Sequence, residues 1–159
     1  MPVEIERKYL LTDDSWREEA GEGVMFRQGY LTSLHGGSVN ASVRVRIEGK
    51  EANVNFKSVT VGASRLEYEY PIPLEDAEEM LDLLSSGPLI EKVRYFIHRD
   101  GVTWEIDEFS GDNKGLVVAE VELDHSSQTP VLPKWVGMEV TEETRYYNAC
   151  LVNNPFSGW

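Results

Sequence analysis

The first residues in this sequence that could do chemistry are three charges at alternate positions near its start, Glu4, Glu6 and Lys8. Successive side chains of a β-strand point to opposite faces, so these three share one face. Two carboxylates that close repel each other unless a cation lies between them. The strand therefore either lies in solvent or faces a charged ligand, and the rest of the chain bears on that choice.

Pairs of like charge recur at the same spacing along the chain, and basic pairs alternate with acidic pairs. On a bare sheet surface such pairs are mildly destabilising, so charged ligands are expected to compensate them. The pattern favours a polyanion with a divalent metal, such as a chain of phosphates with Mg²⁺. The alternative is an acidic sandwich with solvated outer faces. The pairs are Arg44 and Arg46, Glu67 and Glu69, Lys92 and Arg94, Glu105 and Asp107, and Glu120 and Glu122, with Lys57 as a single base.

Composition narrows the class of protein. The 159 residues suit a single domain spanning 1–159, with 41% hydrophobic and 27% charged residues, as in ordinary soluble proteins. A formal net charge of −13 argues against a nucleic-acid surface, which requires clustered Lys and Arg. Cys150 is the only cysteine, so neither an internal disulfide nor a cysteine-based zinc site is expected. No apolar stretch approaches the roughly 20 residues of a membrane span, and a cytoplasmic protein is predicted.

Most of the chain alternates between polar and apolar residues, which is typical of β-strands. Asp100-Gly101 is a hairpin dipeptide, and Gly36-Gly37 marks another turn. Eight strands in a chain of this length need their edges protected, and closure into a barrel removes edges altogether. The predicted fold is therefore mainly β, a closed eight-stranded antiparallel barrel whose interior holds a small ligand. The strands are expected near residues 2–11, 27–34, 39–49, 51–58, 65–73, 90–100, 101–108 and 116–123.

A few peripheral helices complete the prediction. Apolar residues at helical spacing and acids in the first turn predict a helix over 74–85. A second helix is expected near 142–152. Residues 13–25 and 109–115 are predicted to be loops, and the Pro-rich stretch 125–137 is predicted to cross one end of the sheet.

The order of these motifs resembles the CYTH, or triphosphate tunnel metalloenzyme, superfamily, and in particular its short bacterial branch linked to inorganic triphosphate hydrolysis. The resemblance spans residues 3–148. It begins with the ExExK strand and continues through the RxR, lysine, ExE and KxR strands to an acidic strand and a last ExE strand. It implies an eight-stranded barrel around a polar tunnel that binds triphosphate with a divalent metal. Two positions depart from the pattern, Asn55 and Tyr147.

The resemblance and the chemistry of the side chains together imply roles for the tunnel residues. Bases bind phosphate oxygens, the arginines in bidentate fashion, and carboxylates hold Mg²⁺ or Mn²⁺. Glu67 and Glu69 are expected to hold a second ion that activates the attacking water. Asp107 is either a metal ligand or an orienting partner for an arginine. The expected substrate-binding residues are Lys8, Arg44, Arg46, Lys57, Lys92 and Arg94, and the expected ligands of the first ion are Glu4, Glu6, Glu120 and Glu122.

Tyr30 shares a strand face with Gln28 and Thr32 and could enter the tunnel. A phenol beside a lysine such as Lys92 has a lowered pKa and can orient or deprotonate water, so both residues are candidate catalytic groups. The alternative is that Tyr30 is an aromatic wall of the barrel.

Several functions remain open at this point. The leading hypothesis is a metal-dependent inorganic triphosphatase acting on a small polyphosphate. The alternatives are a class IV-type adenylate cyclase, a nucleoside or thiamine triphosphatase, and a non-enzymatic polyphosphate-binding module. The module is disfavoured, because binding a polyanion alone calls for bases without so many carboxylates. Outward aromatics, among them Tyr68 and Tyr70, could form the contact of a homodimer.

Overall fold

The computed structural model describes residues 2–32 and 40–159. Within these ranges nine strands form one antiparallel sheet, and alternating side chains along each strand face the inside and the outside of the sheet. The strands are β1 (Val3–Leu11), β2 (Val24–Tyr30), β3 (Ala41–Glu48), β4 (Glu51–Ser58), β5 (Ser64–Pro71), β6 (Ile90–Arg99), β7 (Val102–Phe109), β8 (Val117–Glu122) and β9 (Val136–Glu139).

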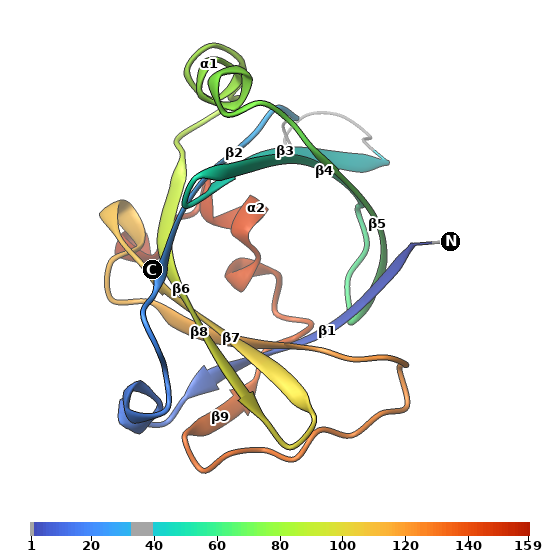
Figure 1. Cartoon of the computed structure of the whole chain (residues 1–159), viewed down its shortest axis with the longest axis vertical. Coiled ribbons are helices and arrows are strands. Elements are labelled where there is room, and N and C mark those ends of the chain that lie inside the picture. Colours follow the sequence, from blue (N-terminus) through green and yellow to red (C-terminus); the bar gives the residue numbers. More distant parts are fainter. Residues whose placement is uncertain (1, 33–39) are drawn as a thin grey trace.

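The sheet closes on itself, as Figure 1 shows. Its spatial order is β5-β4-β3-β2-β6-β7-β8-β1-β9, and β5 also pairs with β1. That pairing joins Val3 to Leu66 and Glu4 to Arg65, whereas the other half of β1 pairs with β9. The predicted eight-stranded barrel is therefore confirmed, with β9 as an additional strand.

Three hydrophobic clusters support the barrel, and two of them lie on its outer face. One contains Trp16, Trp104 and Trp135, with a short 3-10 helix at Ser15–Glu18 packed against the outside of β6 and β7. Another lies beneath helix α1 (Leu74–Leu84), which covers the outside of β3 and β4. The outer face of the barrel thus supplies much of the apolar burial that leaves the inner face free for charged side chains.

The third cluster lies inside the barrel. Inward-facing Phe109, Leu116 and Val118 pack there against the C-terminal segment, which contributes Tyr146 and Leu151. Figure 1 shows the short helix α2 (Asn148–Leu151) within the ring of strands. One part of the barrel interior is therefore an ordinary apolar core, and α2 is not peripheral as predicted.

The C-terminal helix is also much shorter than predicted. The expected helix over 142–152 is replaced by a 3-10 turn at Thr144–Tyr146 and by α2. Between them, Tyr147 has an extended backbone (φ −71°, ψ 136°), which interrupts any continuous helix. Tyrosine and threonine are weak helix formers, and here the hydroxyl of Tyr147 bonds elsewhere, to the carbonyl of Thr141 at 2.6 Å.

Other differences are local. The 3-10 helix at Ser15–Glu18 lies in the predicted loop 13–25, and the first half of β9 lies in the predicted Pro-rich crossing. The hairpin turn at Asp100-Gly101 is confirmed, with positive φ at both residues (52° and 75°). The predicted turn at Gly36-Gly37 lies outside the described residues. Every helix within the described ranges is too short or too polar to cross a bilayer.

Candidate active site

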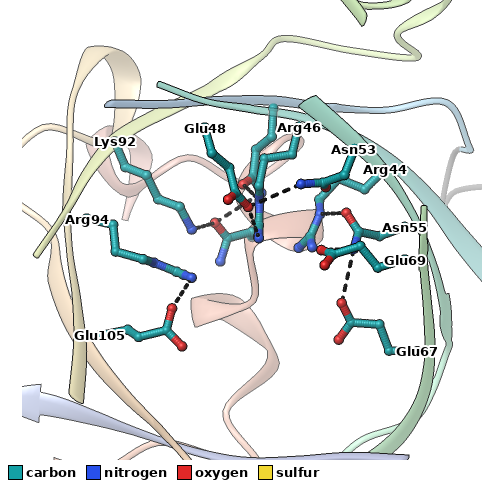
Figure 2. Close-up of polar contacts among 12 residues, drawn as sticks. Arg44, Arg46, Glu48, Asn53, Asn55, Glu67, Glu69, Lys92, Arg94 and Glu105 are labelled. Atoms are coloured by element: carbon teal, nitrogen blue, oxygen red, sulfur yellow. Dashed lines mark hydrogen bonds and ion pairs between the residues drawn. The ribbon is translucent and has the colours of Figure 1, made fainter. Parts of the chain in front are cut away.

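The inner face of the barrel encloses a polar cavity of about 110 Å³. Its walls carry side chains from most of the strands and from the C-terminal segment, and Figure 2 shows part of this set. The alternation seen in the sequence thus brings residues far apart in the chain to one site. Of the predicted site residues, the cavity is lined by Glu4, Glu6, Lys8, Tyr30, Arg44, Arg46, Lys57, Glu67, Lys92, Arg94 and Glu120.

A buried ion-pair network holds two of the bases on β6. Asp107 has no exposed surface and accepts hydrogen bonds from Lys92 Nζ (2.7 Å) and from Arg94 Nε and Nη2 (2.7 and 2.9 Å). Burial raises the pKa of Asp107, but Arg94 and Lys92 lower this pKa by more than burial raises it, so the carboxylate stays ionised. Asp107 does not line the cavity. In this structure its carboxylate holds the two bases of β6 in place, and a role as metal ligand stays a prediction.

Lys92 itself is fully enclosed by protein. Burial lowers its pKa to about 7, and the nearby Arg94 and Arg46 act in the same direction, although Asp107 opposes them. Its Nζ also donates to Oδ1 of Asn148 at 2.9 Å. An amine with this pKa exchanges its proton near neutral pH, which suits either phosphate binding or proton transfer.

The carboxylates of β1 differ in their surroundings. Glu4 pairs with Lys57 at 3.0 Å, whereas Glu6 has no hydrogen bond or ion pair through its side chain within the described part of the chain. Burial and the neighbouring Glu120 raise the pKa of Glu6 to about 8. Glu120 remains ionised, because Lys8 (3.2 Å) and Arg94 lower its pKa by more than burial raises it.

The described residues contain no group of three or more His, Cys, Asp or Glu side chains already placed around a single cation position. The donor set nevertheless fits a divalent metal. Glu4, Glu6 and Glu120 are oxygen donors on one cavity, and their mutual repulsion appears in the raised pKa of Glu6. A cation among them would remove that repulsion.

Besides Asp107, two predicted acidic residues, Glu69 and Glu122, do not line the cavity. Glu69 is exposed and accepts a hydrogen bond from Asn55 Nδ2 at 2.8 Å, while Glu67 accepts from the same nitrogen at 3.1 Å (Figure 2). Glu122 lies exposed at the end of β8, next to Glu6 in the strand register. Asn55, a departure from the family pattern, therefore fixes two carboxylates and also accepts from Arg44 Nε at 3.3 Å.

Tyr30 is buried and lines the cavity, where its hydroxyl lies 3.5 Å from Gln28 Nε2. Gln28 also donates to Asn148 and accepts from Arg46 Nε, so the phenol belongs to a polar network rather than to a purely aromatic wall. A role in orienting water stays a prediction.

Sequence reasoning missed several cavity residues. Glu105 lines the cavity, forms an ion pair with Arg94, and was passed over in favour of Asp107 although both belong to the same acidic pair. Burial raises the pKa of Glu105 to about 7; Arg94 counteracts part of that rise, and Glu120 adds to it. Asn148 and Tyr147 reach the cavity only because the C-terminal segment enters the barrel, which no strand pattern could indicate.

The fold and the site place this chain in the class of closed antiparallel β-barrel proteins with a charged interior. Comparison with known sequences gives the family. The CYTH domain matches residues 2–151, so the chain belongs to the CYTH domain family. Among curated relatives, an inorganic triphosphatase of Acetivibrio thermocellus is 43% identical over 159 residues, covering 100% of this chain and 99% of the relative. An inorganic triphosphatase of Nitrosomonas europaea is 37% identical over 152 residues, with 94% and 96% coverage.

Solved structures agree with the barrel. A crystal structure of an inorganic triphosphatase, 34% identical to this chain, superposes with a TM-score of 0.66 over 96% of this chain and 95% of its own.

Proposed function

We propose that this protein is a divalent-metal-dependent hydrolase of inorganic triphosphate that acts in the charged cavity of its barrel. The main support is that one cavity is lined by bases and by carboxylates together, as a polyanion with bound metal requires. The names of the two curated relatives support the same activity. Binding alone would not call for a repelling set of carboxylates.

The bases bind and orient the phosphate chain. Arg44 and Arg46 offer planar forks to phosphoryl oxygens, and Lys57 and Lys8 offer single charges. Most of these bases are paired with carboxylates in the free protein, so they are already held in position when the substrate arrives. Because the transition state of phosphoryl transfer spreads charge over several oxygens, catalysis here is largely positioning and neutralisation.

Glu4, Glu6 and Glu120 are the residues that would hold Mg²⁺ or Mn²⁺. When bound, the ion supplies positive charge beside the phosphoryl oxygens and acidifies water. Glu67, which lines the cavity beside Lys57 at 3.7 Å, is a proposed ligand of a second ion.

Lys92 is the proposed proton acceptor. With a pKa of about 7, its Nζ is partly neutral at physiological pH and can take a proton from water. Asp107 and Asn148 hold that nitrogen at 2.7 and 2.9 Å and so fix its direction. Tyr30 is a proposed second group that orients water from the neighbouring wall.

Three broader predictions also remain proposals: a single domain over 1–159, a location in the cytoplasm, and a homodimer. The dimer would use the outer face of β4 and β5, where Phe56, Tyr68 and Tyr70 are exposed.

One assay tests the proposed function. Phosphate release is measured from tripolyphosphate, ATP and thiamine triphosphate, with Mg²⁺, with Mn²⁺ and with EDTA. We expect the highest kcat/KM for tripolyphosphate and no turnover in EDTA. Production of cyclic AMP from ATP would instead identify an adenylate cyclase, and full turnover in EDTA would disprove the metal requirement.

A further inference from the structure

Two of the bases that line the cavity have no acidic partner in the described part of the chain. Lys8, Arg46, Lys57, Lys92 and Arg94 each form an ion pair. Arg44 and Arg65 do not, and residues 33–39 contain no Asp or Glu that could pair with them. Arg44 is already one of the proposed phosphate-binding residues, whereas Arg65 has no role in the function described so far.

Arg65 lies one step beyond the proposed triphosphate site along the barrel wall. It faces inward on β5 two residues before Glu67, which pairs with Lys57 across the β4–β5 ladder. Two residues of a strand span about 7 Å. The guanidinium therefore extends the row of bases beyond Lys57, towards the connection between β4 and β5.

The side chain of Arg65 is held in place without an acidic partner. Its Nη2 donates to the carbonyl of Gly62 at 3.1 Å, and its guanidinium carbon lies 5.2 Å from the centre of the Tyr147 ring. The Tyr147 hydroxyl accepts from the Gly62 N–H at 3.2 Å and donates to the Thr141 carbonyl at 2.6 Å, so the ring itself is fixed.

The fork of Arg65 keeps unused donors. Its Nε is buried with no hydrogen-bond partner among the described residues. Although Glu4 lies opposite it in the strand register and Glu67 lies on the same face, Arg65 pairs with neither. Arg65 is half-buried, and an arginine with a purely structural role between two acids would be expected to form a charge-assisted hydrogen bond with one of them.

We propose that Arg65, oriented by Tyr147, forms an outer subsite that binds the phosphoryl group at the end of a linear polyphosphate longer than triphosphate. This inference rests on the proposed function, because it places the first three phosphoryl groups against the inner bases. It makes Arg65 a residue that determines chain-length specificity. The parent protein should then bind tetrapolyphosphate more tightly than tripolyphosphate.

Calorimetric titration tests the subsite. Tripolyphosphate and tetrapolyphosphate are titrated separately into the parent protein and into Arg65→Gln, in EDTA so that the chains stay intact. We expect Arg65→Gln to lose about tenfold in affinity for tetrapolyphosphate, as for one charge-assisted contact, and clearly less for tripolyphosphate. The affinity of Arg65→Lys for tetrapolyphosphate should lie between those of the parent and Arg65→Gln, because lysine keeps the charge but loses the planar fork of the guanidinium.

Arg99→Gln is the matched control, since it removes the same charge from an exposed ion pair with Glu19 on the outside of the barrel. It should keep the parental preference for the longer chain, and circular dichroism should show both variants folded. Equal affinity of the parent for the two chains, or an equal loss for both chains in Arg65→Gln, would overturn the subsite while leaving the proposed function intact. Failure of the parent to bind either chain in EDTA would overturn the subsite, whereas the proposed function is decided separately by phosphate release with metal.

Discussion

The interior of this barrel has two parts that are built on opposite principles. In one, bases and carboxylates from β1, β3, β4, β6 and β8 surround a polar cavity. In the other, Phe109, Leu116 and Val118 close around Tyr146 and Leu151 as any protein core does. The same strands contribute to both, since Val118 and Glu120 are two residues apart on one face of β8. Stability and ligand binding are thus divided along the strand rather than between domains.

The two parts meet through the C-terminal segment. Lys8 Nζ donates to the carbonyl of Tyr146 at 3.1 Å, and Lys92 Nζ donates to the side chain of Asn148. The residues next to them, Tyr146 and Leu151, are buried in the apolar part. Packing of the apolar part therefore positions two bases of the charged part.

The largest loss of stability is expected from a substitution in the buried ion-pair network of the charged part. Asp107→Asn leaves the buried Lys92 without its ion-pair partner and removes one of the carboxylates paired with Arg94, which should cost about 3–5 kcal/mol of unfolding free energy. Thermal denaturation should show a fall in melting temperature of about 10 °C. Glu108→Gln, which breaks an exposed ion pair with Arg17, should change the free energy of unfolding by no more than about 1 kcal/mol. Similar losses in the two variants would contradict a special role for Asp107.

The apolar part gives the next largest effect. Leu151→Ala removes a buried side chain that packs in the interior cluster, and should cost about 2–4 kcal/mol, measured by denaturant unfolding. The exposed Leu83 on α1 is a control, and Leu83→Ala should have little effect. If Leu151→Ala unfolds like the parent protein, the C-terminal segment contributes no core.

The contrast between the two parts also explains what the sequence could predict. Charges at alternate positions, such as Arg44 and Arg46, gave both the strands and the inward face, because period-two patterns encode both at once. The apolar part could not be predicted in this way. Its members Tyr146 and Leu151 lie in a segment with no strand pattern, and only tertiary packing brings them into the barrel. The same holds for β9, where four residues around Gly137 become a strand only by pairing with β1.

Within the site, the sequence predicted the types of residue better than it predicted which of them line the cavity. Glu105 and Asp107 have the same spacing and charge, yet one lines the cavity and the other lies buried behind it. Strand tilt and the packing of neighbouring side chains decide that difference, and neither is visible in a single sequence. Glu69 and Glu122 stand at exposed positions for the same reason.

A binding effect without a stability cost is expected at Arg44. Arg44→Ala removes a base that has no acidic partner in the described chain, so the melting temperature should stay unchanged or rise. Its loss of a charge-assisted contact should weaken tripolyphosphate binding by about 1.5–3 kcal/mol, measured by calorimetric titration. An unchanged dissociation constant would place Arg44 outside the site.

The smallest effect is a dependence of stability on pH that arises from Glu6. The pKa of this carboxyl is about 8 in the folded protein and about 4.5 when unfolded, so between these values the folded state binds the extra proton. Stability from this group is therefore fully present below about pH 4.5 and is lost as pH rises through 8.

Glu6→Gln has no proton to lose. In EDTA its melting temperature should match that of the parent near pH 5 and exceed it by roughly 3 °C or more near pH 8. Asp124→Asn, an exposed acid beyond the end of β8, should show no such divergence. A constant difference between parent and Glu6→Gln from pH 5 to 8 would mean that Glu6 ionises normally and that the carboxylates of the charged part do not repel one another.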